Sequence, residues 1–364
     1  MTSIVSPILF DRITSWSQAG FDLSLAAFQR SAAEILSKGS GFGRAPTYAG
    51  ALEDWVPTCK AAIEAGDARA FFESHFAAFV IHDTERPQGL FTGYYEPLVE
   101  GTRHAHPEFP VPVYRKPADL VTFSPEEAKQ TGLAYGRRRN GKAEGYDTRQ
   151  MIEEGVLRDQ GLEICWLKDW TDAFFMHIQG SGRMKLAEGG EIRLAYAGKT
   201  GQPYTGIGGV LLTRGVGTPD TMSMQMLRGW MKDHPAEARS LMWNNKSYVF
   251  FQEIAVTDPN LGAIGAAKVN LTPLRSLAVD RRHWMFGTPI FLETTTPPET
   301  PGGAKPFVEL MIAQDTGTAI KGLVRGDVYW GWGEEQAHIA GHMKSPGKMT
   351  VLLPHAVGRS LGFL

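Results

Sequence analysis

The sequence is poor in the features that would identify several common classes of protein at once. Its 364 residues include only two cysteines, Cys59 and Cys165, which excludes a disulfide framework and a Cys-rich metal site and leaves room for one bridge at most. The formal net charge is −2 with both signs mixed along the chain, so we expect no nucleic-acid partner. The first residues, MTSIVSPILFDRITSW, contain no basic segment followed by a continuous apolar run, and therefore predict no signal peptide, lipobox or spanning helix.

What the chain does contain is glycine, with 41 residues, and a hydrophobic content of 43%. This composition favours a mainly β fold with many turns, on a chain long enough for two domains. Helical spacing of apolar residues predicts a helix over 22–36 and two more within 48–75, broken at 65–67. A last pair is predicted over 223–243, opened by Thr218-Pro219-Asp220 as a cap and proline start.

Short apolar runs bounded by Gly and Pro are typical of strands. We predict strands at 89–99, 109–114, 173–179, 248–254, 289–293, 306–314 and 349–353. Since these segments are widely separated, they indicate a barrel or sandwich built from non-adjacent pieces. Two polar stretches, 136–146 and 294–305, are predicted as surface insertions, and the arginines at 137–139 as a solvated loop rather than a binding patch.

The strongest chemical signal is the segment LMIAQDTGTAIKGLVRGDVYWGWG at 310–333. Asp315 and Asp327 stand at the edges of apolar strands, where partial desolvation raises the pKa of a carboxyl and can keep it protonated as a general acid. Tyr329, Trp330 and Trp332 could offer flat apolar faces to sugar rings. The alternative has about equal weight: both aspartates bind turn amides, and the aromatic residues belong to the core.

Two upstream turns could contribute polar groups to a sugar site. FTGYYEP (91–97) and HIQGSGR (177–183) contain hydroxyl and amide side chains that suit hydrogen bonds to a glycan, although such a segment is more often a structural turn. These side chains are Thr92, Tyr94, Tyr95, Gln179 and Ser181. The order Gly180-Ser181-Gly182 lacks the outer glycine of a nucleophile elbow, and no phosphate-binding loop is present.

A metal site is a weaker possibility. Glu335, His338 and His342 have the spacing of one helical face and could hold a metal ion, but Gly341 disfavours a helix there. We therefore expect capping or surface histidines and no metal.

The motifs together resemble one family. FTGYYEP, MHIQGSGR, AYAGKTGQPYTGIGGVLL, TPDTMSMQMLRGW, YVFFQE, SLAVDRRHWMFGTPIFL and AQDTGTAIKG..RGDVYWGWGEEQAHIAG occur in the order typical of the membrane-bound lytic murein transglycosylase A family. The resemblance runs from about Phe91 to Pro354. Asp280, Asp315 and Asp327 occupy the positions that give the family's three-aspartate domain its name, whereas Thr318 replaces a frequent second glycine.

The resemblance implies a fold of two domains. A large domain with a double-psi β-barrel would comprise 1–97 and 218–364, including the three-aspartate region 265–354, and a smaller β domain would be inserted at 98–217. The glycan would bind in a groove between them.

The resemblance also implies a reaction: cleavage of the β-1,4 bond between N-acetylmuramic acid and N-acetylglucosamine in peptidoglycan, with formation of 1,6-anhydromuropeptides. Asp327 would be the catalytic acid, and Asp315 and Asp280 would support it. The residues expected to bind substrate are Thr92, Tyr94, Tyr95, Gln179, Ser181, Lys199, Tyr204 and Gln314. No cofactor or metal would be required. The alternatives are an inactive glycan-binding barrel and, with less weight, a metal-dependent hydrolase.

The expected partner is therefore the peptidoglycan glycan strand, and cell-wall synthesis complexes are a further candidate. By family resemblance the protein would act on the periplasmic side of the cell envelope. Association with the outer membrane would require a lipid anchor, and the family's lipoprotein cysteine is missing from the printed N-terminus.

Overall fold

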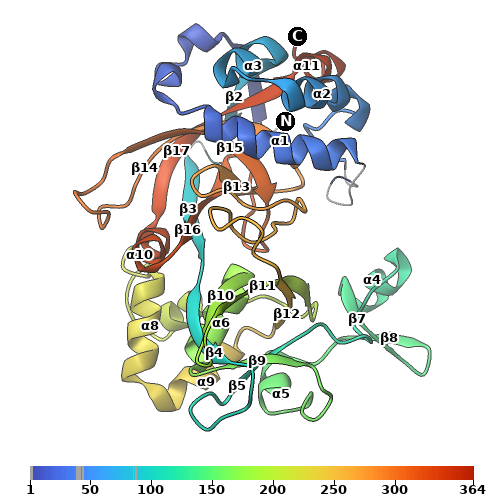
Figure 1. Ribbon diagram of the computed structural model, residues 1–364, viewed down its shortest axis with the longest axis vertical. Helices are drawn as coiled ribbons and strands as arrows, with labels where there is room; N and C mark the ends of the chain where they lie inside the picture. The colour runs from blue at the N-terminus through green and yellow to red at the C-terminus, as the bar shows by residue number, and fades with distance from the viewer. Residues whose placement is uncertain (1–2, 38–41, 43–44, 85, 87) are drawn as a thin grey trace. The chain divides into compact units, whose positions relative to one another are not determined.

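The computed structural model describes residues 3–37, 42, 45–84, 86 and 88–364, which form two compact units (Figure 1). The terminal unit contains both chain ends, 1–95 and 258–364, and the insert unit contains 96–257. The insert unit thus continues past Gly217, the predicted end of the inserted domain. It does so because α8 (Met224–Asp233) and α9 (Pro235–Trp243) share an apolar cluster with α6 (Trp170–Gln179).

The terminal unit is built on one eight-stranded sheet in the order β1-β2-β17-β14-β15-β13-β16-β3. Because β3 pairs with both β16 and β17, six of these strands form a closed ring. The strands are β1 (Ser3–Ile8), β2 (Phe76–Asp83), β3 (Gly89–Glu96), β13 (Ser276–Val279), β14 (Pro289–Thr295), β15 (Pro306–Asp315), β16 (Arg325–Trp332) and β17 (Lys344–Pro354).

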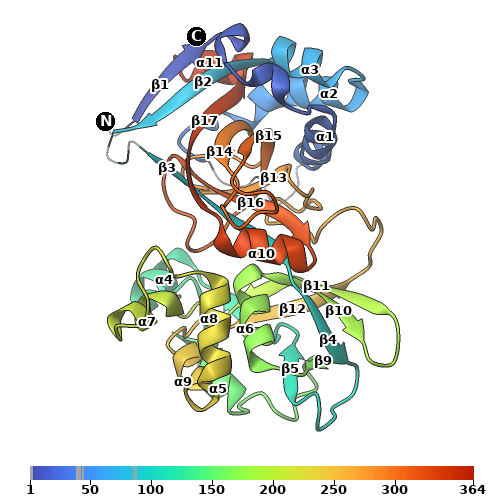
Figure 2. The same ribbon diagram turned by 90° about the vertical axis from the view of Figure 1, so that its left-hand side faces the viewer.

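Helices cover this sheet at two places. Figure 1 shows α1 (Asp22–Leu36), α2 (Val56–Glu64), α3 (Ala68–His75) and α11 (His355–Ser360) gathered near β2, while α10 (Glu334–His342) lies beside β16 (Figure 2). The helix predicted over 22–36 is confirmed at both ends. The break predicted at 65–67 is also confirmed, since Asp67 caps α3 by accepting a hydrogen bond from the Ala70 amide.

The insert unit has a six-stranded sheet in the order β12-β11-β10-β4-β9-β5 and a small sheet of β6, β7 and β8. The strands are β4 (Leu98–Thr102), β5 (Val111–Tyr114), β6 (Val121–Thr122), β7 (Tyr135–Arg139), β8 (Lys142–Glu144), β9 (Glu163–Leu167), β10 (Ser181–Leu186), β11 (Glu191–Lys199) and β12 (Val249–Ile254). The remaining helices are α4 (Pro125–Thr131), α5 (Arg149–Glu153) and α7 (Ile207–Thr213).

Two sequence predictions are wrong in this unit, and a third is wrong in part. The apolar run 173–179 lies in helix α6, because the Asp169 side chain caps the first turn and Gly180 ends the helix in the left-handed conformation. Thr218-Pro219-Asp220 opens no helix, since Ser223 is the N-cap of α8. The segment 136–146 lies at the surface as predicted, but it contains the β7–β8 hairpin instead of a loop. Arg138 and Arg139 are exposed, whereas Arg137 binds Asp147.

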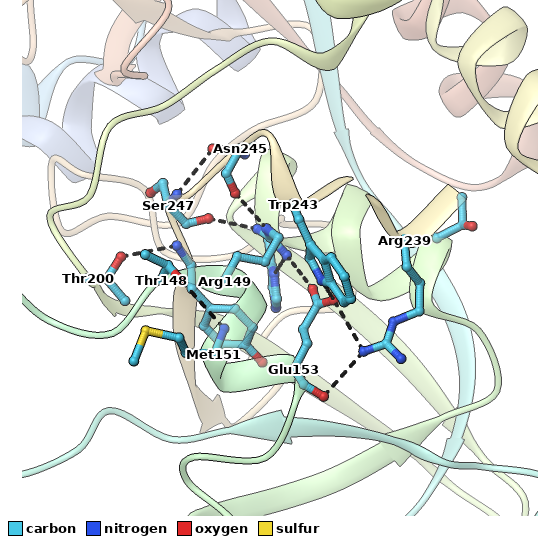
Figure 3. Close-up of polar contacts among 12 residues, drawn as sticks. Thr148, Arg149, Met151, Glu153, Thr200, Arg239, Trp243, Asn245 and Ser247 are labelled. Atoms are coloured by element: carbon cyan, nitrogen blue, oxygen red, sulfur yellow. Dashed lines mark hydrogen bonds and ion pairs between the residues drawn. The ribbon is translucent and has the colours of Figure 1, made fainter. Parts of the chain in front are cut away.

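The interior of the insert unit contains a buried arginine with a full set of partners (Figure 3). Arg149 is 1% exposed and donates to Glu153 at 3.1 Å and to the backbone oxygens of Asn245 and Ser247 at 3.1 and 2.8 Å. Its guanidinium also lies over the rings of Phe174 and Tyr248. This cluster joins α5 to the segment that leads into β12.

Both cysteines are free and buried, Cys59 in the terminal unit and Cys165 in the insert unit. Burial raises the pKa of each thiol to about 12, so neither is a ready nucleophile. Among the described residues, no helix is both long and apolar enough to cross a membrane.

Candidate functional site

Two of the three predicted aspartates flank one strand of the terminal unit. Ala278 on β13 is in register with Asp315 on the parallel strand β15 and with Asp327 on the antiparallel strand β16. Neighbouring strands lie about 4.8 Å apart, so the two aspartate backbones are roughly 10 Å apart across the small side chain of Ala278. The topology therefore brings together two carboxyl groups that are separated by a turn and a loop in the sequence.

Asp315 is held by three hydrogen-bond donors. Its Oδ1 accepts from the amides of Ala266 and Thr316 at 3.0 and 2.9 Å, and its Oδ2 accepts from the Tyr94 hydroxyl at 3.1 Å. The pKa of Tyr94 is raised well above its usual value by burial and by the nearby aspartates. The phenol therefore keeps its proton and donates a hydrogen bond to Asp315. Three donors stabilise the charged form of a carboxyl.

Asp327 has a sparser environment. Its Oδ1 accepts a hydrogen bond from the Thr92 hydroxyl on β3 at 2.5 Å. The same hydroxyl oxygen accepts a hydrogen bond from Nη2 of Arg325 at 2.7 Å. Asp327 keeps some exposed surface, which a group that transfers a proton to a substrate requires.

Burial raises the pKa of both carboxyl groups. For Asp327 the charge of Arg325 and the Thr92 hydrogen bond oppose the rise; for Asp315 the two amides and Tyr94 do so. The charge of Asp327 also raises the pKa of Asp315, so the two groups disfavour simultaneous ionisation. Because Asp315 has three donors and Asp327 one, a shared proton is favoured on Asp327.

Asp280 serves a neighbouring loop. Its carboxylate accepts from the Gly322 amide at 2.9 Å and pairs with the Arg282 guanidinium. Although burial disfavours its charge, these hydrogen bonds lower the pKa of Asp280 to about 2. Asp280 is therefore a fixed anion that holds the segment leading into β16.

The aromatic residues after Asp327 are mostly core. Tyr329 is 1% exposed and Trp330 is 8% exposed, and Trp330 donates from Nε1 to Sδ of Met343. The suggestion that these two rings offer faces to a sugar is wrong, while Trp332 is partly exposed. Gly93 in the FTGYY motif explains part of the packing, since a Cβ there would lie 2.7 Å from Trp330 Nε1.

Two further predicted residues of the terminal unit lie inside it. Gln314 is fully buried, and its amide donates to the Ala27 carbonyl and the Ser31 hydroxyl while its oxygen accepts from Ser276. Tyr95 is 5% exposed. Gln314 thus has internal partners that join α1 to β15.

The other predicted substrate residues belong to the insert unit. Gln179 ends α6 and Ser181 begins β10, on either side of the C-cap Gly180. Lys199 ends β11, and burial lowers the pKa of its amine. Tyr204 lies in the loop before α7 with 39% of its surface exposed. Three of the four thus lie at the ends of α6, β10 and β11, and Tyr204 lies in a loop of the same unit.

The candidate metal ligands lie on α10, despite Gly341. His342 Nδ1 contacts the His338 carbonyl oxygen at 2.8 Å. Within the described part of the chain, no group of three or more His, Cys, Asp or Glu side chains is arranged to hold a metal ion.

Arg325 was missed in the sequence although a signal for it exists. Residues two apart on a strand point to the same face, so the order Arg325-Gly326-Asp327 could have placed the guanidinium beside the carboxyl. Such a cation within reach of a candidate acid influences its pKa.

Two family models match the chain. The model described as MltA specific insert domain matches 90–252, and the one described as 3D domain matches 275–353. The first match covers nearly the whole insert unit, and the second contains Asp280, Asp315 and Asp327.

Similar proteins cover most of the chain. Membrane-bound lytic murein transglycosylase A from Vibrio cholerae is 31% identical over 83% of this chain and 74% of its own length. A crystal structure of a membrane-bound lytic murein transglycosylase from Agrobacterium tumefaciens is 33% identical with a TM-score of 0.88, covering 98% of this chain and 99% of that one. E. coli MltA with bound chitohexaose is 27% identical with a TM-score of 0.66, over 96% and 91% of the two chains.

Proposed function

This chain belongs to the membrane-bound lytic murein transglycosylase A family, and we propose that Asp327 transfers the proton in its reaction. The enzyme is a lytic transglycosylase that cleaves the β-1,4 bond between N-acetylmuramic acid and N-acetylglucosamine in peptidoglycan. One observation supports Asp327 above all: among the described residues it has a single hydrogen-bond donor, while the neighbouring Asp315 has three. Asp327 is therefore the carboxyl better suited to carry a proton.

The reaction uses the Asp327 carboxyl twice, first as an acid and then as a base. Protonated Asp327 donates it to the glycosidic oxygen, and the bond from that oxygen to C1 of the muramoyl residue breaks with oxocarbenium character. The resulting carboxylate takes a proton from the muramoyl 6-hydroxyl as its oxygen bonds to C1. The product is a 1,6-anhydro sugar, and Asp327 ends the cycle protonated.

One carboxyl can suffice because the nucleophile belongs to the substrate. Ordinary glycosidases use a second carboxyl as base or nucleophile. A hydroxyl held correctly near C1 has a high effective concentration, which can contribute roughly 7 to 11 kcal/mol towards the barrier. In this proposal the three hydrogen-bond donors of Asp315 favour its charged form and leave the proton to Asp327, while Asp280 fixes the loop before β16.

We assign glycan binding to four residues of the insert unit: Gln179, Ser181, Lys199 and Tyr204. Amide, hydroxyl and amine groups can hydrogen-bond to sugar hydroxyls and acetamido groups, and the partly exposed ring of Tyr204 can pack on a sugar face. Thr92 and Tyr94 act instead through the aspartates they contact. The E. coli relative with bound chitohexaose supports glycan as the ligand class.

Three finer features belong to the same proposal. The closed ring of six strands would have double-psi connectivity. The enzyme would act on the periplasmic side of the envelope, and a lipid anchor would be needed to hold it at the outer membrane. Cell-wall synthesis complexes are candidate partners.

The experiment that tests Asp327 is mass spectrometry of peptidoglycan digests. We expect anhydromuropeptides from the wild type and from Asp11→Asn, a matched control whose side chain is 74% exposed. Asp327→Asn should lower their rate of formation by about 10²- to 10⁴-fold, the usual contribution of general acid and base catalysis. Unchanged activity of Asp327→Asn would refute the assignment, and products with reducing ends would indicate hydrolysis instead.

A further inference from the structure

The contacts of Arg325 form a chain that ends at the proposed catalytic acid. Nη2 of Arg325 lies 2.7 Å from Oγ1 of Thr92, and Oγ1 of Thr92 lies 2.5 Å from Oδ1 of Asp327. Nη1 of Arg325 binds the Gly326 carbonyl, which fixes the guanidinium on its own strand. Two strands thus supply three side chains in a line: Arg325 and Asp327 from β16, and Thr92 from β3.

The direction of these hydrogen bonds follows from the chemistry of the groups. A guanidinium only donates, so the oxygen of Thr92 must accept from Arg325. A threonine hydroxyl has one proton, and that proton is then left for Asp327. Thr92 therefore donates to Oδ1 of Asp327 in both protonation states of the carboxyl.

We propose that Arg325 is a positioning residue that, through Thr92, reserves Oδ1 of Asp327 as an acceptor and leaves Oδ2 to carry the transferred proton. In a protonated carboxyl the carbonyl-type oxygen is the better acceptor, so an obligatory donor at Oδ1 places the acidic proton on the other oxygen. This inference rests on the proposed role of Asp327. It adds that one defined oxygen, Oδ2, gives a proton to the leaving group and takes one from the 6-hydroxyl.

The arrangement also affects the charge that develops on Asp327. As the carboxyl gives up its proton, the Thr92 hydrogen bond strengthens and the Arg325 charge stabilises the new anion. The charged or titratable groups that interact with Asp327 are Arg325 on the same strand, Asp315 on β15 and Tyr94 on β3. Tyr329 on β16 interacts in turn with Tyr94. Arg325 is the cation of this set, and it lowers the pKa of Asp327.

The test compares the pH profiles of Arg325→Met and Arg325→Lys with that of the wild type, using the rate of anhydromuropeptide formation. Loss of the cation raises the pKa of Asp327, so Arg325→Met should lower kcat about tenfold, leave KM unchanged and move the basic limb of the profile to higher pH. Arg325→Lys keeps the charge and should leave the basic limb in place, with an intermediate kcat.

Thr92 provides the second arm. Thr92→Val removes the hydroxyl and should lower kcat as Arg325→Met does, whereas Thr92→Ser should restore most of it. Because Arg325 acts in part through the hydrogen bond that Thr92 donates, the double variant Thr92→Val with Arg325→Met should lose clearly less activity than the product of the two single losses. Thermal unfolding of each protein shows whether it is folded, and if Arg325→Met does not fold, Arg325→Lys and the Thr92 variants decide the outcome.

Three results would overturn the inference: an unchanged basic limb in Arg325→Met, fully multiplicative losses in the double variant, or no rescue by Thr92→Ser. Its failure is distinct from that of the proposed function. If Asp327→Asn is inactive and the Arg325 and Thr92 variants behave like the wild type, Asp327 remains the proposed acid and the positioning role of Arg325 is refuted. If Asp327→Asn remains active, the assignment of the acid itself falls.

Discussion

The two units each contain a buried cluster of charged side chains, and the clusters differ in how completely their charges are compensated. In the insert unit, Arg149 contacts a carboxylate, a histidine and two carbonyl oxygens (Figure 3). Glu153 in turn accepts a hydrogen bond from Trp243 and lies 3.9 Å from Arg239. In the terminal unit, Asp327 has one donor and faces a second carboxyl.

This difference separates a structural role from a chemical one. A buried charge with full partners is costly to disturb and has little tendency to change its protonation state. A buried carboxyl with few hydrogen-bond partners keeps the raised pKa that burial gives it. This raised pKa lowers the stability of the folded protein at neutral pH but allows the carboxyl to donate a proton. The sparser cluster is therefore where we place the reaction.

The largest effect is expected from removing the charge of Arg149, which has the most hydrogen-bond partners of the two clusters. Arg149→Met should destabilise the protein by about 3 to 5 kcal/mol, because it leaves Glu153 with fewer partners and removes the donor to two buried carbonyl oxygens. Urea unfolding measures the loss. Arg214→Met is the matched control in the same unit, since Arg214 is 39% exposed and its ion pair with Glu237 should contribute less than about 1 kcal/mol. Similar losses in both variants would contradict the structural reading of the Arg149 cluster.

The next effect is a pH dependence located in the insert unit. Arg149 can only donate to Nδ1 of His177, so this histidine is neutral, and burial followed by the Arg149 charge lowers its pKa well below the usual value. Folding stability is then present above pH ~6.5 and is lost as pH falls, by roughly 1.4 kcal/mol per unit, or about 2 kcal/mol at pH 5.

His177→Asn tests this dependence, because the Asn oxygen can still accept from Arg149 but does not titrate. Its free energy of unfolding should change less than that of the wild type between pH 7 and 5. His355→Asn serves as the control, since His355 is partly exposed and should leave the dependence unaltered. Equal slopes in His177→Asn and the wild type would show that His177 is not held neutral.

Local sequence signals predicted the helices and strands better than they predicted the tertiary contacts. The helix over 22–36 has both an apolar period and clear ends, and its bounds are confirmed. The run 173–179 was mistaken for a strand because a short apolar segment fits both the helical and the strand period. The helix is specified by its capping residues Asp169 and Gly180, which lie outside the run. Element type thus depended on capping residues that the apolar pattern did not include.

The candidate site was predicted in part for the same reason. Asp315 and Asp327 stood out by their position at the edges of apolar strands, and the FTGYYEP motif indicated that Thr92 and Tyr94 contribute to a site. Their partners could not be derived, since Thr92 contacts an aspartate 235 residues away and Tyr94 one 221 residues away. The Arg149 cluster was missed entirely, because its members converge only after the sheet has formed.

A smaller effect should distinguish the two aspartates. Asp315→Asn removes a like charge that disfavours simultaneous ionisation of the two aspartates, so the pKa of Asp327 should fall. The basic limb of the activity profile should then move to lower pH, with about tenfold less activity above it. This shift is opposite in sign to that expected for Arg325→Met. A shift to higher pH, or none, would show that Asp315 does not act on Asp327 through its charge.

The smallest effect is a gain in stability at the proposed catalytic residue. Burial raises the folded-state pKa of Asp327, so the wild type loses stability as pH rises from about 3.9, where the unfolded chain ionises, through that raised value. Asp327→Asn does not ionise and can still accept from Thr92. It should therefore be more stable than the wild type by about 1 kcal/mol at pH 7 and equal to it near pH 3. Thermal unfolding at the two pH values measures this difference, with Asp11→Asn as the control. A loss of stability in Asp327→Asn at pH 7 would mean that the charge of Asp327 is as well compensated as that of Arg149. The contrast between the two clusters would then disappear.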